Sequence, residues 1–356
     1  MDCKYVATIG FFDGVHKGHR YLINKVCEMA RAEGLQSMVI TFDRHPREVL
    51  QADYRPQLLT TPSVKVSLLR QTGADRVEVL HFTRELAALS AREFMDRVLC
   101  RELHVCRLVI GYDHRFGHDR AEGFDDYVRY GRELGIEVVQ NNEMKLQFHP
   151  SGGAADDTSA SVGPDAAAAR SALAAGMHVS STTIRRLLSC GNVGMAAMLL
   201  DRHHTLLGHV VHGFAEGRKM GYPTANLDTA GYPLLVPAAG VYAVAVRVCR
   251  TGSELDEPAD ASPVTVSLDE FPPHLAEGWM PAMLNIGTRP TFGGSGITVE
   301  AHILNFCGDI YGRPMAVAFY EKIRDEHRFA SIEALGRQLA ADRDAVRRHF
   351  GMFSRK

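Results

Sequence analysis

Two histidines, His16 and His19, flank Gly18 in the stretch Gly-Phe-Phe-Asp-Gly-Val-His-Lys-Gly-His that ends at position 19. Residues 5–9 before it are apolar and suit a buried strand, whereas residues 17–30 after it carry apolar side chains at helical spacing. Both histidines are therefore expected at a helix start, where unpaired backbone N–H groups and the helix dipole favour phosphate. Gly18 lacks a Cβ, so a phosphate chain can approach the backbone closely. The pattern indicates an H-x-G-H phosphate clamp.

Two other interpretations of this turn fit the same spacing. Asp13 could cap the helix in a surface turn whose histidines are solvated. The two histidines could also be a fragment of a zinc site, although structural zinc takes four ligands and no cysteine pair lies nearby.

Three further polar segments stand where a predicted strand ends or a predicted helix begins. They are Thr-Phe-Asp-Arg-His-Pro at 41–46, Gly-Tyr-Asp-His-Arg-Phe-Gly at 111–117, and Val-Ser-Ser-Thr-Thr-Ile-Arg at 179–185. The hydroxyl residues of the last segment are also compatible with an ordinary N-cap before the apolar positions 184, 187 and 188.

In this order the four segments resemble those of H-x-G-H nucleotidyltransferases, and more narrowly of the bacterial bifunctional riboflavin kinase and FMN adenylyltransferase (FAD synthetase) family. The resemblance implies transfer of AMP to FMN without a protein nucleophile, because the acceptor phosphate itself attacks. It assigns catalytic roles to His16, His19 and Arg185, whose guanidinium is a permanent cation for the leaving pyrophosphate. It places ATP at Gly10, Phe12, Asp13, His16, Gly18, His19, His45, Ser180, Ser181, Thr182 and Arg185. It places the flavin at Asp113, Arg115 and Phe116.

The second half resembles the riboflavin kinase module of the same family, through residues 208–213 and 217–227. Pro223 fixes the backbone before Thr224 and Asn226, whose alternation on an extended segment points both oxygens the same way. Hard oxygen donors suit Mg²⁺, so these two residues are the expected magnesium ligands. The resemblance assigns the ATP phosphates to Gly213, Gly217, Arg218, Gly221, Thr224 and Asn226. As a bare pattern, the glycines and the Pro-Thr pair would also fit a plain β-turn.

Phosphorylating the primary alcohol of riboflavin needs a base that takes its proton. Glu300, on the strand-like stretch 299–304, matches the family's catalytic base. Its alternative is a solvent-facing strand glutamate. The resemblance also assigns flavin contacts to Asn285 and Arg324.

The pattern of elements predicts two domains in the 356 residues. Apolar runs alternate with helical patterns in the first, which predicts a doubly wound, Rossmann-like parallel sheet over 1–190. After a linker at 191–205, short alternating strands with Gly and Pro turns predict a small antiparallel β-barrel over 206–356. The predicted strands are 38–42, 77–80, 108–111, 136–139, 240–248, 283–286, 299–304 and 315–319, and the predicted helices include 86–99, 127–134 and a closing helix at 331–350.

Two segments match no motif and are expected to be surface excursions. Residues 151–176 are rich in Ala, Ser, Gly and Asp, and residues 250–279 mix acidic residues with prolines. The second segment could instead extend a hairpin, because Val-Thr-Val at 264–266 is strand-like.

Composition limits the classes of partner. The net charge of −2 and the absence of a basic tract argue against nucleic acid, so small anionic substrates are expected. Seven scattered cysteines fit reduced thiols, and no signal peptide or membrane-length apolar run is evident, which predicts a cytoplasmic protein without membrane contact. The sequence carries no signal for an oligomeric state.

Together these features predict an enzyme that makes FMN from riboflavin and ATP in its C-terminal module and FAD from FMN and ATP in its N-terminal module. Both steps are expected to need Mg²⁺. The alternatives are a riboflavin kinase with a non-catalytic N-terminal domain and a flavin-sensing protein that controls a partner.

Overall fold

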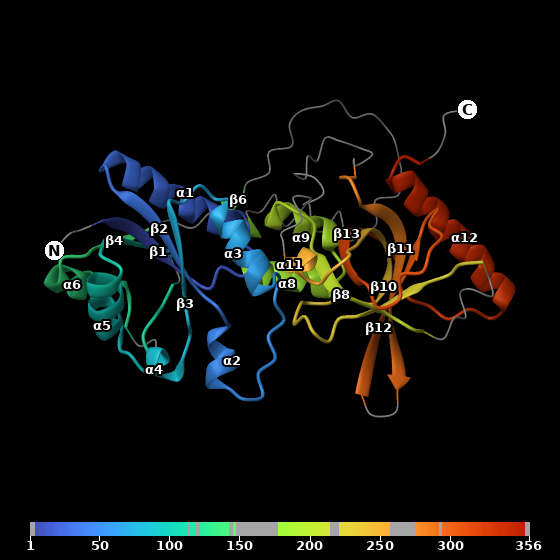
Figure 1. Ribbon diagram of the computed structural model, residues 1–356, viewed down its shortest axis with the longest axis horizontal. Helices are drawn as coiled ribbons and strands as arrows, with labels where there is room; N and C mark the ends of the chain where they lie inside the picture. The colour runs from blue at the N-terminus through green and yellow to red at the C-terminus, as the bar shows by residue number, and fades with distance from the viewer. Residues whose placement is uncertain are drawn as a thin grey trace. The chain divides into compact units, whose positions relative to one another are not determined.

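A five-stranded parallel sheet organises the first part of the chain (Figure 1). Its order is β3-β2-β1-β4-β5, and every neighbouring pair is parallel. The strands are β1 (Tyr5–Ile9), β2 (Gln36–Phe42), β3 (Arg76–Leu80), β4 (Val105–Ile110) and β5 (Glu137–Gln140). The order reverses at β1, so the carboxyl ends of β1 and β4 lie at the switch point where such sheets bind ligands. The predicted doubly wound α/β fold is confirmed.

The computed structural model describes residues 4–112, 114–118, 122–141, 145–146, 177–213, 221–256, 275–291 and 294–352. The chain divides into two units. The first contains residues 1–56, 62–147 and 176–180, and the second contains residues 57–61, 148–175 and 181–356.

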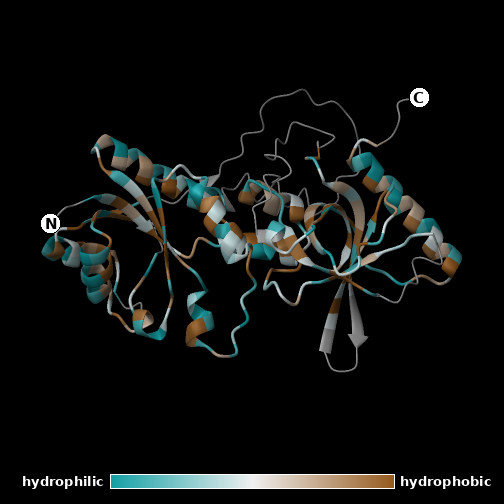
Figure 2. Ribbon diagram, in the orientation of Figure 1, coloured by the Kyte–Doolittle hydropathy of each residue, from teal (hydrophilic) through white to brown (hydrophobic). Residues whose placement is uncertain are grey.

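Helices cover both faces of the sheet. On one face, α1 (Lys17–Ala32) buries Val26 and Ala30 against strand residues, and α3 (Pro62–Arg70) adds Leu68 and Leu69. Bands of hydrophobic and hydrophilic residues alternate along α1, as expected of a helix that buries one side (Figure 2). On the other face lie α5 (Ala91–Phe94), the π-helical η1 (Met95–Glu102) and α6 (Phe124–Leu134).

The single helix predicted over 86–99 is wrong. The chain instead forms α4 (Arg84–Ala87), then a break, then α5 continuing into η1. Ser90 causes the break because it caps a new helix: its Oγ accepts from Glu93 N at 3.2 Å, while Glu93 Oε2 accepts from Ser90 N at 3.0 Å.

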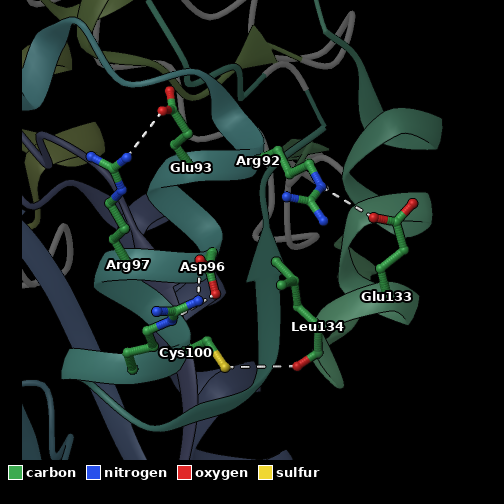
Figure 3. Close-up of polar contacts among 8 residues, drawn as sticks. Arg92, Glu93, Asp96, Arg97, Cys100, Glu133 and Leu134 are labelled. Carbon is green, nitrogen blue, oxygen red and sulfur yellow. Dashed lines mark hydrogen bonds and ion pairs between the residues drawn. The ribbon is translucent and has the colours of Figure 1, made fainter.

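Polar contacts brace α5 and η1 against α6 (Figure 3). Arg92 Nε donates to Glu133 Oε2 at 3.1 Å, and Cys100 Sγ lies 3.7 Å from the carbonyl oxygen of Leu134. The exposed ion pair adds little stability, but together the two contacts link the helices that carry Phe94 and Tyr127.

A closed barrel of order β10-β11-β12-β9-β8-β13 forms the second unit, in which every pair is antiparallel. Its strands are β8 (Thr205–Val211), β9 (Ala225–Asp228), β10 (Gly240–Val248), β11 (Met280–Thr291), β12 (Gly294–Ile303) and β13 (Pro314–Arg324). The closing helix α12 (Ile332–His349) contacts β10, β11 and β13. The predicted barrel and its C-terminal helix are confirmed.

Residues 57–61, a short strap from early in the chain, belong to this second unit. Leu58 forms a parallel bridge with Leu234: its N–H donates to Pro233 O, and Leu235 N donates to Leu58 O, both at 2.8 Å. Helices α8 (Ser181–Ser189) and α9 (Val193–Leu200) pack together in the same unit, so α9 lies inside the stretch predicted as a linker.

Some predictions fall outside the described residues. The excursion at 151–176 and residues 257–274 of the second excursion are not described; residues 253–256 form α11 (Ser253–Asp256). Cys106 on β4 is disulfide-bonded, which corrects the expectation of reduced thiols throughout. Among the described residues, the cysteines with free thiols are Cys27, Cys100, Cys190, Cys249 and Cys307.

Candidate functional sites

The H-x-G-H turn uses one of its histidines as a helix cap. His16 is the N-cap of α1, and its Nδ1 accepts from the backbone N–H of His19 at 3.3 Å. Because Nδ1 is an acceptor, the neutral ring carries its proton on Nε2. The two imidazoles stack with centroids 3.5 Å apart. The helix start therefore presents imidazole donors beside its own backbone N–H groups, the combination that phosphate prefers.

This arrangement bears on the alternatives for the turn. His16 is only 3% exposed and, rather than Asp13, caps the helix, so a solvated surface turn capped by Asp13 does not describe it. Within the described ranges, no group of three or more His, Cys, Asp and Glu side chains could hold a metal ion. The zinc-fragment interpretation thus finds no third ligand of these types there.

Backbone strain and close packing shape the same turn. Phe12 and Val15 adopt left-handed φ angles of 54° and 38°, which cost energy for residues with bulky side chains. A Cβ on Gly18 would lie 3.0 Å from Val179 O and 3.2 Å from the His16 ring. The segment that leads to Ser180 therefore passes directly over Gly18. This contact brings Ser180 into the neighbourhood of the histidines within the first unit.

His45 repeats the capping device at the end of β2. It is the N-cap of α2 (Pro46–Leu50), and its Nδ1 accepts from Arg47 N at 3.1 Å. The ring of Phe11 meets the His45 ring edge-on, with centroids 4.8 Å apart. Thr41 Oγ1 donates to Phe11 O at 3.2 Å, which ties the ends of β1 and β2 together.

Sequence reasoning missed Lys65, which lies beneath this corner. Its side chain is 1% exposed, its Nζ donates to Phe42 O at 2.7 Å, and it lies 3.9 Å from the centroid of the Phe11 ring. Burial lowers the pKa of Lys65 to about 8, although Asp13 and Asp43 act in the opposite direction. A lysine in a helical pattern normally indicates a solvated face, so the sequence held no signal for it.

A cavity of about 350 Å³ opens at the carboxyl ends of β1 and β2. Two predicted flavin residues, Arg115 and Phe116, line it, while Asp113 lies outside the described residues. Its other lining residues are largely apolar or aromatic: Ile9, Phe11, Phe42, Pro46, Leu50, Phe82, Leu86, Ala87, Leu89, Phe94, His114, Gly117 and His118. An aromatic-lined cavity with an arginine in its wall suits a flat aromatic ring that carries an anionic substituent.

Tyr127 fixes the cavity wall, and sequence reasoning treated it only as part of a helical pattern. Its ring stacks on Phe116 at 4.2 Å, and its hydroxyl accepts from Phe116 N and donates to Phe116 O, each at 3.1 Å. Burial raises the pKa of Tyr127, which keeps this hydroxyl protonated as a donor.

The remaining predicted ATP residues of the first site begin helix α8. Ser181, Thr182 and Arg185 lie on this helix, which belongs to the second unit. Arg185 Nε donates to Gln57 O at 2.9 Å, a contact within that unit. Ile184 and Leu188 of this helix are buried.

In the barrel, three predicted kinase residues form one row across adjacent strands. Asn226 on β9 pairs with Glu300 on β12, and Glu300 pairs with Asn285 on β11. Directly paired residues point to the same face of a sheet. Their sequence neighbours on each strand are buried, whereas these three are partly exposed, so the row lies on the outer face of the barrel.

Gly213 lies against the side chain of Asn226, one of the residues of this row. A Cβ at position 213 would lie 2.0 Å from Asn226 Nδ2, so any larger residue here would displace the amide. Gly221 adopts a left-handed φ of 80° shortly before Thr224, while Gly217 and Arg218 lie outside the described residues. Thr224 and Asn226 offer neutral oxygens two residues apart, a donor set that fits Mg²⁺ when phosphates supply the negative charge.

Arg324 continues the row, because Val241 on β10 pairs with both Asn285 and Arg324. Its Nε and Nη2 bind both carboxylate oxygens of Asp342 on α12 at 2.8–3.0 Å, and its Nη1 donates to Asp325 O at 2.9 Å. Asp342 is 1% exposed. The ion pair therefore fastens α12 to the end of β13 beside the row, and a flavin contact of Arg324 stays a prediction.

Two parts of the chain match the models of two different protein families. Residues 1–150 match the family model described as FAD synthetase, and residues 200–350 match the family model described as riboflavin kinase. The first match covers the sheet with its H-x-G-H turn, and the second covers the barrel with its row of site residues.

Whole-chain relatives unite these modules. The bifunctional riboflavin kinase/FMN adenylyltransferase of Escherichia coli (strain K12) is 33% identical over 347 residues, which covers 98% of this chain and 93% of the relative. That of Pseudomonas fluorescens is 34% identical, covering 96% and 92%. The chain belongs to the bifunctional riboflavin kinase/FMN adenylyltransferase family. The predicted family is thereby confirmed.

A solved structure shares the fold of the whole chain. The crystal structure of a macrolide-efflux protein from Streptococcus pneumoniae matches with a TM-score of 0.72 and 29% identity, covering 98% of this chain and 95% of that one. None of the helices described here combines the length and hydrophobicity needed to cross a lipid bilayer.

Proposed function

We propose that this chain carries out two successive reactions of flavin cofactor synthesis. The barrel module phosphorylates riboflavin to FMN with ATP, and the sheet module adenylylates FMN to FAD with release of pyrophosphate. The observation that carries this proposal is that both family models match, each over its own module, in one chain. The modules are assigned to 1–190 and 206–356, with 191–205 between them.

In the kinase reaction, the oxygen of the riboflavin primary alcohol attacks the γ-phosphorus of ATP while the Glu300 carboxylate takes the proton of that alcohol. The new P–O bond replaces the bond to ADP, which leaves. Thr224 and Asn226 hold Mg²⁺, which neutralises phosphate charge when bound. Asn285, in the same row as Glu300, contacts the flavin. The nucleotide phosphates are held by Gly213, Gly217, Arg218 and Gly221.

In the adenylyl reaction, a phosphate oxygen of FMN attacks the α-phosphorus of ATP and pyrophosphate leaves. The protein supplies position and positive charge rather than a nucleophile. His16 and His19 donate to the phosphates from the start of α1, and Arg185 balances the charge on pyrophosphate. ATP is further held by Gly10, Phe12, Asp13, Gly18, His45, Ser180, Ser181 and Thr182.

The flavin of FMN occupies the cavity at the ends of β1 and β2. Stacking on Phe116, which Tyr127 holds in place, accounts for recognition of the ring. Arg115 and Asp113 complete this contact. The proposal further places the enzyme in the cytoplasm, with small-molecule substrates and no nucleic-acid partner.

The test is incubation of the purified chain with riboflavin, ATP and MgCl₂, with FMN and FAD followed by chromatography. FMN is expected to appear first and then to convert to FAD. FMN that accumulates without FAD would reduce the sheet module to a non-catalytic domain. Binding of flavin without any turnover would favour a flavin sensor instead.

A further inference from the structure

His302 forms a hydrogen bond to the segment that contains the expected magnesium ligands. It lies on β12, two residues beyond Glu300, and its Nδ1 is 2.9 Å from the carbonyl oxygen of Pro223. The edge of the Tyr222 ring meets its imidazole at a centroid distance of 5.2 Å. Because a carbonyl oxygen only accepts, Nδ1 must carry a proton and donate it.

The hydrogen bond acts next to Thr224. Pro223 has a fixed φ and no N–H of its own, so its carbonyl is the one backbone group through which that residue can be held. On the next residues the register is set by strand pairing, where Ala225 pairs with Ala301 and Asn226 pairs with Glu300. Three consecutive residues of β12 therefore hold the Pro-Thr-Ala-Asn segment. The side chain of His302 makes the contact at Pro223, which precedes the first residue of β9.

We propose that His302 is a positioning residue for riboflavin phosphorylation. It fixes Thr224 relative to Glu300, so that the oxygens that receive magnesium-bound ATP and the base that takes the alcohol proton stay in one register. This inference rests on the proposed kinase function and assigns His302 no contact with substrate. A small displacement of a positioned group costs about 10²-fold in rate, which sets the scale of the effect.

Three substitutions separate the hydrogen bond from packing. The side-chain amide N–H of His302→Asn lies where Nδ1–H was, whereas that of His302→Gln lies where Nε2 was, and His302→Ala has neither. His302→Ala and His302→Gln are expected to lower kcat/KM for riboflavin phosphorylation by about 10- to 100-fold, with a higher KM for ATP. His302→Asn is expected to stay within about threefold of the parent.

The molecule provides two controls. FMN adenylylation from supplied FMN should be unchanged in all three variants, which would show that the loss is confined to the barrel module. His209→Ala removes another barrel histidine, one whose ring stacks on Tyr232 at 6.2 Å, and should leave phosphorylation unchanged.

A binding measurement adds a readout independent of turnover. The Kd of magnesium-ADP, measured by calorimetry in a His19→Ala background to weaken the other nucleotide site, should rise about tenfold in His302→Ala and not in His302→Asn. Equal kinetics in His302→Ala and the parent, or equal losses in the Asn and Gln variants, would overturn the proposal. A parent chain that phosphorylates no riboflavin would instead overturn the kinase function on which the proposal rests.

Discussion

The two candidate sites assemble their residues in different ways. The sheet site draws on turns that follow strands, where His16 and His45 each cap the helix that begins next to them. The barrel site draws on strand register, which brings Asn226, Asn285 and Glu300 into one row from distant parts of the sequence. Local backbone geometry therefore sets the first site, and long-range pairing sets the second.

This difference predicts that substitutions in one module leave the other reaction intact. Each activity then shows whether the effect of a substitution is confined to one module.

Glu300→Gln should give the largest loss, because it removes the base while keeping the size of the side chain. Riboflavin phosphorylation should fall by up to about 10⁴-fold, whereas FAD formation from supplied FMN should persist. Chromatographic initial rates measure both. Glu277→Gln, an exposed glutamate of the same unit, is the matched control. Loss of both activities in a folded protein would contradict separate sites.

His19→Ala is the reciprocal experiment. It removes one imidazole of the stacked pair, so FAD formation should fall by about 10²- to 10³-fold, the cost of losing one donor to a developing charge. FMN formation should continue, and FMN should accumulate in the combined assay. An unchanged rate of FAD formation would show that His19 has only a structural role.

Gly213→Ala tests the row by sterics alone. The new methyl would overlap the Asn226 amide and displace it, so phosphorylation should fall by about 10²-fold without loss of FAD formation. Gly231→Ala is the matched control, because a Cβ there meets no atom within 4 Å. Equal rates of riboflavin phosphorylation in the two alanine variants would show that the reaction does not depend on the position of the Asn226 side chain.

Lys65→Met should change stability more than rate. The buried ammonium has a pKa lowered from 10.5 to about 8. Between these values the unfolded chain holds a proton that the folded protein has released, so the free energy of unfolding rises with pH. The methionine variant should therefore be more stable than the parent by about 1–3 kcal/mol at pH 7, with the gap closing toward pH 10.5.

Urea denaturation of both proteins across this pH range measures the difference. FAD formation should fall only several-fold, because Phe11 and the end of β2 lose their tie to Lys65. A variant that is less stable than the parent at pH 7 would show that the contacts of Lys65 outweigh its desolvation.

The sequence predicted what local patterns encode. Strand and helix periodicity was enough for the parallel sheet, and the H-x-G-H spacing was enough to place His16 and His19 at a helix start. It failed where a side chain redirects the backbone, as Ser90 does in breaking the helix predicted over 86–99. It was silent on Lys65 and Tyr127, because their roles depend on Phe42 and Phe116, which only the fold brings close.

The strap at 57–61 has a consequence for synthesis. Leu58 leaves the ribosome well before Leu234, the residue that it bridges in the second unit. Completion of that unit therefore waits for a contact of long sequence separation, the kind that slows folding. For the same reason no single cleavage of the backbone divides this chain into its two units, since residues on both sides of the strap belong to the first.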